Sequence, residues 1–352
     1  EVAGNKATFY AVAQQTMSRG MWIVEVLVIL NCFGLATSYL VVFGETMGTT
    51  WQLKLHAGAD GPQAYQLVQA EVDSVEELMS PWIEGSDISR FASAAVDEAV
   101  VISPLTLEVV SLARETWGAS GGAFDPTIGA LVEASGFGVS SDAAERSERE
   151  AAHSTVGFKA IEIDVEERSL VKLRDGVRLD LSAVAKGYAV DRAAVALSGA
   201  GYEDFFLEVG GEIYCHGVNG EGDEWVIGVE APNLDPLAPR RIFASLSLSG
   251  LGVATSGDYR NRRQLDGEES SHLFNPKSGE TVSSELASVT VIADDCARAD
   301  AYATAAMVMG LEAGVSWLES APGVEAVFIA RDSVGALKMH ATSGCAELGL
   351  MD

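Results

Sequence analysis

The sequence predicts an α+β domain with a mixed sheet, preceded by one apolar N-terminal helix. Segments with period-two alternation, typical of strands, are interleaved irregularly with segments of helical spacing and do not repeat in a regular βαβ order. A continuous apolar run stands near the N-terminus. The remaining length of the 352-residue chain suffices for one large domain or two of moderate size.

The N-terminal apolar run covers residues 21–43 and reads MWIVEVLVILNCFGLATSYLVVF. A helix of about 20 apolar residues spans a bilayer. Lys6 and Arg19 precede the run, so the positive-inside bias leaves the N-terminus in the cytoplasm. We expect residues 1–20 to be a short lead, the run to be a membrane anchor or a signal segment, and residues 44–352 to be a domain on the periplasmic side of the inner membrane. A buried core helix is the alternative.

Strands and helices are expected in alternation along this domain. Period-two patterns predict strands over 46–55, 161–164, 170–173, 177–179, 205–209, 212–216, 224–229, 241–248 and 289–292. Apolar residues at helical spacing predict helices over 63–79, 105–116, 182–199 and 297–309. Residues 141–152 read as a charged helix or a linker. Pro81 ends the first of these helices and the Gly121-Gly122 pair follows the second, because both residue types interrupt helices.

Charge and cysteine content exclude several classes of function. The chain has 51 acidic and 23 basic residues and a net charge of −28, which repels phosphate backbones, so nucleic acid is not expected as a partner. The same charge also fits a solubility adaptation. The four cysteines form no CxxC pair, which argues against zinc and redox motifs. The common catalytic signatures are absent too: no GxGxxG follows a strand, and the chain contains neither a P-loop nor a GxSxG elbow.

A first candidate site lies in the segment LDLSAVAKGYAVD, residues 179–191. A strand is expected to end at Asp180, and a helix of small residues begins there. Asp180 or Ser182 suits the N-cap position of that helix. Lys186 is less expected, because a cation near a helix start opposes the positive end of the dipole. An anionic ligand at that helix start would resolve the conflict.

A second candidate site lies in ADAYATA, where Asp300 and Thr304 are four residues apart and therefore share a helix face. One carboxylate and one hydroxyl suit a hard cation such as Mg²⁺, which fills its other positions with water and phosphate oxygens. The alternative is a buried hydrogen bond between the two side chains.

Eight blocks of sequence, taken in chain order, carry a resemblance to a known family. The blocks are MGTTW, SPWIEGSDISRF, GGAFDPTIGALV, LDLSAVAKGYAVD, EVGGEI, TSGDY, HLFNPKSG and ADAYATA. Together they resemble the motif series of the bacterial FAD:protein FMN transferases, the ApbE family. The match extends from about Thr46 to about Leu318, and eight ordered blocks are far more specific than any single one.

The resemblance implies a fold of mixed α and β structure that holds FAD in a cleft, with Mg²⁺ beside its diphosphate. It implies FAD contacts for Met47, Trp82, Ala123, Phe124, Asp125, Asp180, Lys186 and Leu273. It implies Mg²⁺ ligation by the Ala183 carbonyl, Asp300 and Thr304.

The chain departs from the family pattern at a few positions. Trp82 stands where tyrosine is more common, although either ring can stack on a flavin or an adenine. LVEASGFG, residues 131–138, replaces a run that usually contains Asn-Trp, and Phe274 stands where an aliphatic residue is common.

The implied reaction is attack by a Thr or Ser hydroxyl of a target protein on the FMN-side phosphorus of FAD, with release of AMP. Mg²⁺ and Lys186 would neutralise developing charge, and Asp258 or His272 is the candidate base for the hydroxyl proton. The expected acceptor is a protein such as a subunit of a membrane redox complex. FAD pyrophosphatase activity and non-catalytic flavin binding are the alternative functions.

Overall fold

A nine-stranded antiparallel sheet forms the centre of the protein, as described by a computed structural model. The structure describes residues 22–24, 39–56, 58–139, 142–233, 241–259, 262–265, 268–283 and 285–351. In spatial order the strands are β1 (Trp22–Val24), β2 (Tyr39–Thr46), β3 (Thr49–His56), β7 (Phe205–Val209), β8 (Glu212–His216), β11 (Leu251–Gly257), β14 (Leu286–Ala293), β15 (Val324–Arg331) and β16 (Leu337–Ala341). The predicted α+β class is confirmed, but every neighbouring pair in this sheet is antiparallel, so the sheet is not mixed.

Smaller elements lie around this sheet. A three-stranded sheet has the order β4 (Ala99–Val101), β6 (Ser169–Lys172) and β5 (Ile161–Asp164). Two hairpins pair β9 (Trp225–Glu230) with β10 (Ile242–Leu248), and β12 (Arg262–Leu265) with β13 (Glu268–Ser271). The helices are α2 (Gly61–Met79), α3 (Asp87–Ser93), α4 (Pro104–Ala119), α5 (Gly129–Ala134), α6 (Arg146–His153), α7 (Ser182–Gly199), α8 (Cys296–Met309), α9 (Leu311–Glu319), and the short η1 (Phe158–Ala160) and η2 (Ser343–Ala346).

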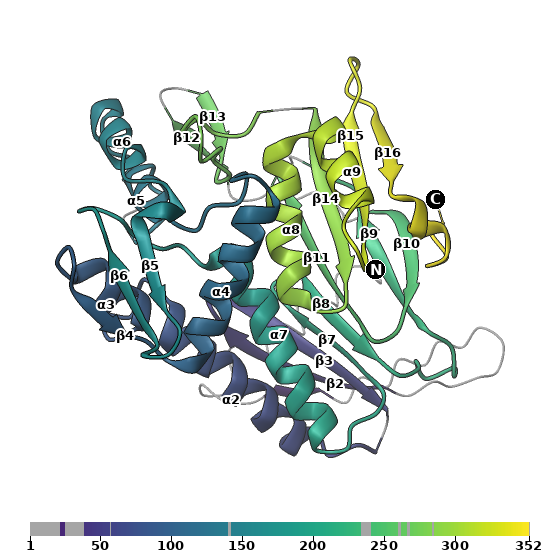
Figure 1. Cartoon of the computed structure of the whole chain (residues 1–352). Helices are drawn as coiled ribbons and strands as arrows, with labels where there is room; N and C mark the ends of the chain where they lie inside the picture. The colour runs from purple at the N-terminus through teal and green to yellow at the C-terminus, as the bar shows by residue number, and fades with distance from the viewer. Residues whose placement is uncertain are drawn as a thin grey trace.

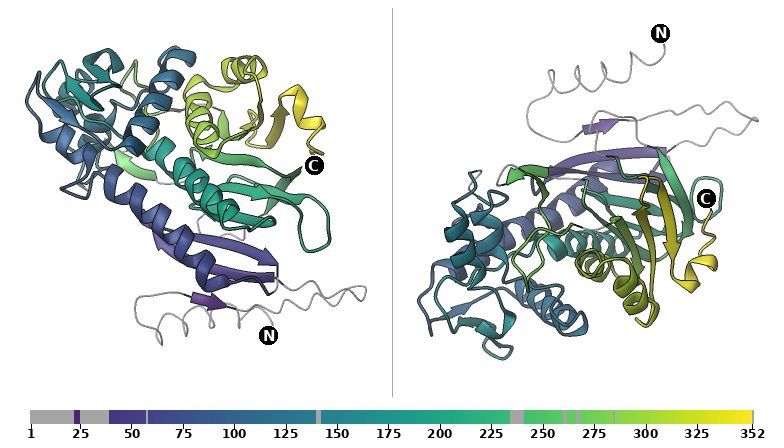
Figure 2. Two further views of the ribbon diagram at one scale, coloured as in Figure 1. Left: turned by 60° about the horizontal axis from the view of Figure 1, so that its bottom comes forward. Right: turned by 90° about the horizontal axis from the view of Figure 1, so that it is seen from above.

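Helices α2, α7 and α8 cover one face of the large sheet, and the three-stranded sheet lies at one end with α3, α5 and α6 (Figures 1 and 2). Small residues let α7 and α8 pack closely: a Cβ placed on Gly187 would lie 2.4 Å from the carbonyl oxygen of Cys296. This close contact brings the two segments that the sequence singles out next to each other.

The sheet is buried on both faces over its second half. Val289 and Val291 of β14 pack toward α8, whereas Ile292 of the same strand packs toward the β9–β10 hairpin. Residues of alternating position in a strand point to opposite faces, and here both faces meet an apolar layer. β14 therefore gives the helix in front of it a rigid support.

The predicted membrane segment 21–43 needs correction at both ends. Residues 39–43 belong to strand β2, which pairs with β3 from Tyr39 opposite His56 to Thr46 opposite Thr49. Leu40 and Val42 are buried in the domain core, so their apolar character serves the sheet. Trp22–Val24 forms strand β1 beside β2, and residues 25–38 lie outside the described residues. Among the helices of the described part, none combines the length and apolar character needed to cross a bilayer.

Two further segments differ from their predictions. Residues 177–179 form no strand, although Arg178 makes an isolated parallel bridge to Ile128. The TSGDY block, whose Ser, Gly and Asp are typical of turns, contributes Thr255, Ser256 and Gly257 to strand β11, and only Asp258 and Tyr259 turn away. β11 pairs with β8 on one side and β14 on the other, and these partners outweigh the turn-forming character of Ser and Gly.

Candidate functional site

The site begins at the N-terminal end of α7, which is irregular. The N-cap of α7 is Leu181, which makes no side-chain cap hydrogen bond, so the prediction of Asp180 or Ser182 at this position is wrong. The Asp180 carboxylate, one residue earlier, accepts a hydrogen bond of 2.9 Å from the N–H of Ser182. Ala183 then has φ −92° and ψ 19°, outside the helical region, so the first turn is kinked. A kink of this kind releases backbone carbonyl groups from the regular helix pattern.

Lys186, one turn further along α7, forms an ion pair with Glu212 at the start of β8. The Lys186 side chain is 30% exposed, whereas that of Glu212 is 4% exposed, so the carboxylate lies behind the ammonium group as seen from solvent. Burial by itself lowers the pKa of Lys186, but Glu212 and Asp300 outweigh it and hold that pKa above its ordinary value. The anion that the sequence led us to expect near Lys186 is therefore present within the chain.

Asp300 and Thr304 lie on α8 with different partners. The Asp300 carboxylate is buried and accepts from the N–H of Gly187 at 3.3 Å. The Thr304 hydroxyl instead shares a hydrogen bond of 3.0 Å with the hydroxyl of Ser256 on β11. Burial raises the pKa of Asp300, and the charge of Lys186 opposes that shift. Asp300 and Thr304 therefore do not hydrogen-bond to each other, which was the alternative to metal binding.

These residues fit the oxygen ligand set of a magnesium ion. The N–H of Gly187, four residues after Ala183, donates to the Asp300 carboxylate at 3.3 Å, so the first turns of α7 lie next to Asp300 of α8. The kinked Ala183, Asp300 and Thr304 supply a carbonyl, a carboxylate and a hydroxyl, which are ligand types that Mg²⁺ accepts. Within the described ranges no group of three or more His, Cys, Asp or Glu side chains is arranged for a metal, and the predicted set contains a single carboxylate.

The turn that carries Ala123, Phe124 and Asp125 is buried and connects to this site. The Asp125 carboxylate accepts from the N–H of Thr127 at 2.9 Å and from the N–H of Phe158 at 3.1 Å. Burial raises the pKa of Asp125, and these hydrogen bonds oppose the shift. The next residue, Pro126, accepts from the N–H of Asp180 at 2.7 Å, so this turn is fixed to the start of α7.

Met47 and Trp82 belong to two loops near the C-terminal end of α2. Met47, in the turn between β2 and β3, has a positive φ of 47°. Its N–H donates to Glu76 of α2 at 2.9 Å, which fixes the turn. Trp82 follows α2 and is 62% exposed, which is unusual for so large an apolar side chain and leaves its ring available to a ligand.

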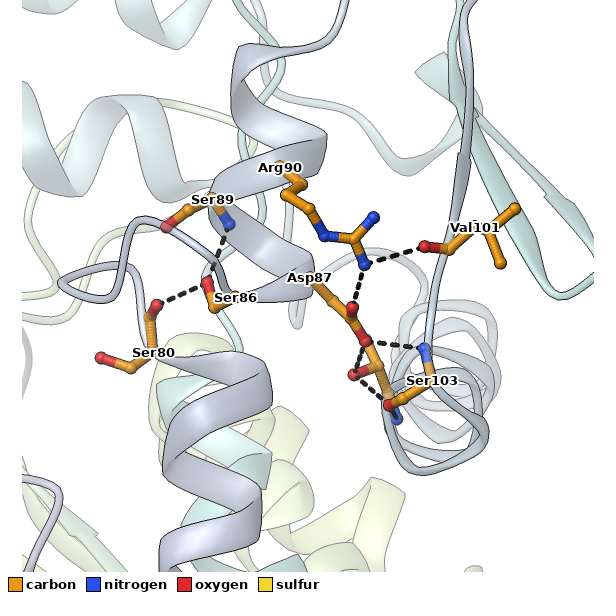
Figure 3. A network of polar contacts seen from close by, with 8 residues as sticks. Ser80, Ser86, Asp87, Ser89, Arg90, Val101 and Ser103 are labelled. Carbon is orange, nitrogen blue, oxygen red and sulfur yellow. Dashed lines mark hydrogen bonds and ion pairs between the residues drawn. The ribbon is translucent and has the colours of Figure 1, made fainter.

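The segment after Trp82 is held by a polar network around the buried Asp87 (Figure 3). Asp87 pairs with Arg90 and accepts from the N–H of Ser103 at 2.7 Å, and Arg90 in turn donates to the carbonyl of Val101 at 2.9 Å. Ser86, the N-cap of α3, donates to the carbonyl of Ser80 at 2.8 Å. The network ties the Trp82 loop to α4 and to the three-stranded sheet.

Further network contacts come from Thr106, whose hydroxyl donates to Asp87 at 2.6 Å. The Asp87 carboxylate is therefore surrounded by donors from its own helix, α3, and from the start of α4. A buried carboxylate satisfied in this way rigidifies its surroundings.

The two candidate bases differ in their surroundings. Both carboxylate oxygens of Asp258 accept from the Arg331 guanidinium, at 2.8 and 3.0 Å. His272 follows β13 and lies beside Phe137, with ring centroids 6.5 Å apart. Its neighbour Leu273 is buried against α8 in the second core cluster. Asp258 is thus engaged in a bidentate ion pair, so His272 is the candidate that we retain.

Phe137 and Phe274, two positions at which the sequence departs from the family pattern, contact each other. Their ring centroids are 5.9 Å apart in an edge-to-face arrangement, which is favourable for aromatic pairs.

The structure brings together α7, β8, β11 and α8 around Lys186, Asp300 and Thr304. Two acidic residues of this region had not been assigned a role from the sequence. Glu212 stands in the quoted block EVGGEI, and Asp191 ends the block LDLSAVAKGYAVD. Each is an acidic residue within an otherwise apolar or small-residue stretch, and that was the signal available in the sequence.

Comparisons with known proteins agree with this geometry. The model of the ApbE family matches residues 47–328. An FAD:protein FMN transferase of Vibrio cholerae is 35% identical over 282 residues, which cover 79% of this chain and 83% of that protein. One from Escherichia coli K12 is 31% identical over 285 residues, 79% of this chain and 80% of its own. The solved structure of the flavin transferase ApbE from Vibrio cholerae superposes with a TM-score of 0.79 at 31% identity, covering 89% of this chain and 99% of the other.

Proposed function

This chain belongs to the ApbE family and is an FAD:protein FMN transferase, and we propose that it works with Mg²⁺ at the junction of α7, β8 and α8. The proposed acceptor is a Thr or Ser hydroxyl of an exported protein, such as a subunit of a membrane redox complex. The observation that carries this proposal is the cluster of Lys186, Asp300 and Thr304 beside the kinked Ala183.

The ligands proposed for Mg²⁺ are the Ala183 carbonyl, Asp300 and Thr304. When bound there, Mg²⁺ would neutralise the negative charge that develops on diphosphate oxygens during transfer. Lys186, whose side chain is 30% exposed, adds a second positive charge. The other residues proposed to contact FAD are Met47, Trp82, Ala123, Phe124, Asp125, Asp180 and Leu273.

The transfer forms one bond and breaks one. The acceptor hydroxyl oxygen bonds to the FMN-side phosphorus, and the bond from that phosphorus to the bridging oxygen breaks, so AMP leaves with that oxygen. His272 takes the hydroxyl proton in this proposal, because Arg331 engages both carboxylate oxygens of Asp258. With water in place of the hydroxyl, the same steps would give free FMN and AMP, which is the pyrophosphatase alternative.

The test compares the parent chain with Asp300→Ala and Thr304→Val, given FAD, Mg²⁺ and a candidate acceptor protein. AMP release, covalent flavin fluorescence on the acceptor and thermal unfolding are measured together. We expect transfer to stop with a chelator, to fall by about 100-fold or more in Asp300→Ala, and to fall less in Thr304→Val, because Asp300 is the charged ligand. Glu312→Ala, at an exposed position of α9, is the matched control and should behave as the parent.

Each product identifies one function. Flavin on the acceptor supports transfer, free FMN with AMP supports the pyrophosphatase, and unchanged FAD supports flavin binding alone. A folded Asp300→Ala chain that releases AMP at the parental rate would show that the metal assignment is wrong.

For location we propose that the domain lies on the periplasmic side of the inner membrane. The support comes from the sequence: an apolar stretch follows Lys6 and Arg19 and ends before strand β2, although its residues Trp22–Val24 pair with β2 in the structure. Membrane fractionation and protease accessibility from outside test this, and a mainly soluble cytoplasmic pool would contradict it.

A further inference from the structure

Lys186 lies between two buried carboxylates that come from different elements. Glu212 of β8 forms an ion pair with its ammonium group. Asp300 of α8 accepts from the backbone N–H of Gly187, the next residue of α7, at 3.3 Å. The charges of both carboxylates raise the pKa of Lys186 against the effect of its burial, so both act on the ammonium group. Of these two carboxylates, Glu212 forms an ion pair with the ammonium group, and Asp300 contacts the backbone of the next residue.

The surroundings of Glu212 differ from those of an ion pair whose main role is to stabilise the fold. Its side chain is 4% exposed, and within the described part of the chain one carboxylate oxygen, Oε2, has no hydrogen-bond partner. A buried ion pair often adds little to stability compared with an apolar pair, and an unsatisfied buried oxygen has a further cost. The arrangement calls for an explanation other than stability.

Which carboxylate pairs with Lys186 decides whether Asp300 is available as a Mg²⁺ ligand. If the ammonium group paired with Asp300, it would neutralise the single carboxylate of the proposed magnesium ligand set. Pairing with Glu212 leaves the charge of Asp300 available, and the Lys186 side chain is still 30% exposed. Because Glu212 approaches from the buried side, it does not cover the face of Lys186 that a diphosphate would approach.

We propose that Glu212 is a positioning residue, which holds Lys186 away from Asp300 and thereby keeps Asp300 open for Mg²⁺ and Lys186 directed at the FAD diphosphate. The inference rests on the proposed function of Lys186 and Asp300 and adds a residue to which no role had been assigned. Glu212 itself need not touch either Mg²⁺ or FAD.

The experiment is a double-mutant cycle read by Mg²⁺ binding to the full chain without FAD, measured by titration calorimetry. Glu212→Gln keeps the size of the side chain and removes its charge. The Mg²⁺ dissociation constant should rise about tenfold or more, because Lys186 then pairs with Asp300. Lys186→Met combined with Glu212→Gln should recover most of this loss, because the competing ammonium group is gone.

A purely structural role predicts a different pattern, in which the double variant binds Mg²⁺ no better than Glu212→Gln. That result, or unchanged Mg²⁺ affinity in Glu212→Gln, would overturn the inference. Glu71→Gln is the matched control, because Glu71 forms an ion pair of 2.9 Å with Arg192 further along α7. It should bind Mg²⁺ as the parent does.

Two further variants keep the outcome interpretable. Glu212→Asp retains the charge and should bind Mg²⁺ nearly as well as the parent, a comparison that does not need a folded Glu212→Gln protein. Asp300→Ala should lose Mg²⁺ binding. If it does while Glu212→Gln binds normally, only the positioning role fails; if Asp300→Ala binds Mg²⁺ as the parent does, the proposed metal site itself fails.

Discussion

The Asp191 carboxylate on α7 accepts hydrogen bonds from the first two N–H groups of α8, at 2.7 Å from Cys296 and 2.9 Å from Ala297. The N–H groups at a helix start have no partner within the helix and carry its positive dipole end, so a carboxylate suits them. Because Asp300 lies one turn further along α8, Asp191 fixes the register between the two helices that form the site.

The burial of the Asp191 carboxyl predicts a dependence of stability on pH. Burial raises the pKa of Asp191 from 3.8 to about 7, against the effect of the two N–H donors. Between these pH values the folded chain holds more protons at Asp191 than the unfolded chain does. The contribution of this group to stability is therefore largest below about pH 4 and is lost as the pH rises toward about 7.

Urea unfolding at about pH 5 and about pH 8 checks this, with Asp191→Asn for comparison. The free energy of unfolding should fall less between the two pH values in the variant than in the parent. An equal fall in both proteins would show that other groups cause the dependence.

Gly187→Ala is expected to separate α7 from α8. The added Cβ would lie 2.4 Å from the carbonyl oxygen of Cys296, which is backbone and cannot rotate away. We expect a loss of about 1–3 kcal/mol in the free energy of unfolding, together with weaker FAD binding, because the shift displaces Asp300. Gly199→Ala, at the end of the same helix with nothing within 4 Å, should be neutral or slightly stabilising. Equal effects of the two substitutions would contradict the packing argument.

Much of the fold could be predicted where a periodic segment lies between clear breaks. The helix over 182–199 and the strands over 161–164, 205–209 and 212–216 have the bounds expected from the sequence. β2 was missed because its residues Tyr39–Phe43 are apolar on both faces of the sheet and continue the apolar run before them. Local periodicity does not show at which residue of such a run one element ends and strand β2 begins.

The site was predictable in its residue types and not in its pairings. Lys186 was singled out because a cation near a helix start needs an anion, and that argument was satisfied by Glu212, 26 residues away along the chain. The contact of Asp191 with Cys296 spans 105 residues. Such pairings depend on how β8 and α8 pack on α7, which a single sequence does not contain.

Lys186→Met is expected to weaken FAD binding while the chain stays folded. A charged hydrogen bond to a diphosphate is worth about 1.5–3 kcal/mol, so the dissociation constant for FAD should rise about 10- to 100-fold. Lys186→Arg should keep part of the affinity, because the charge remains. The dissociation constant for FAD is measured by fluorescence titration of the parent, Lys186→Met and Lys186→Arg, and thermal unfolding shows whether each protein is folded. Unchanged affinity in Lys186→Met would leave Lys186 with only its structural pairing to Glu212.

Trp82→Ala should separate ligand binding from stability. The side chain is 62% exposed and follows the end of α2, so its removal should change the free energy of unfolding by no more than about 0.5 kcal/mol. If the ring stacks on the flavin or the adenine of FAD, the loss in binding should be about 1–3 kcal/mol, as for other stacked bases. Trp82→Tyr, which keeps an aromatic face, should retain most of the affinity.

Asp87→Asn tests the loop that carries Trp82 by a different route. The carboxylate of Asp87 is buried among donors from Arg90, Ser103 and Thr106, and an amide can satisfy only part of them. We expect both lower stability, by about 1–3 kcal/mol, and weaker FAD binding, because the loop loses its attachment to α4. Urea unfolding and FAD titration of Trp82→Ala, Asp87→Asn and the double variant give the answer. If the loop acts through the ring, the losses of FAD affinity in the two single variants will not add; fully additive losses would mean that Asp87 influences the FAD site independently of Trp82.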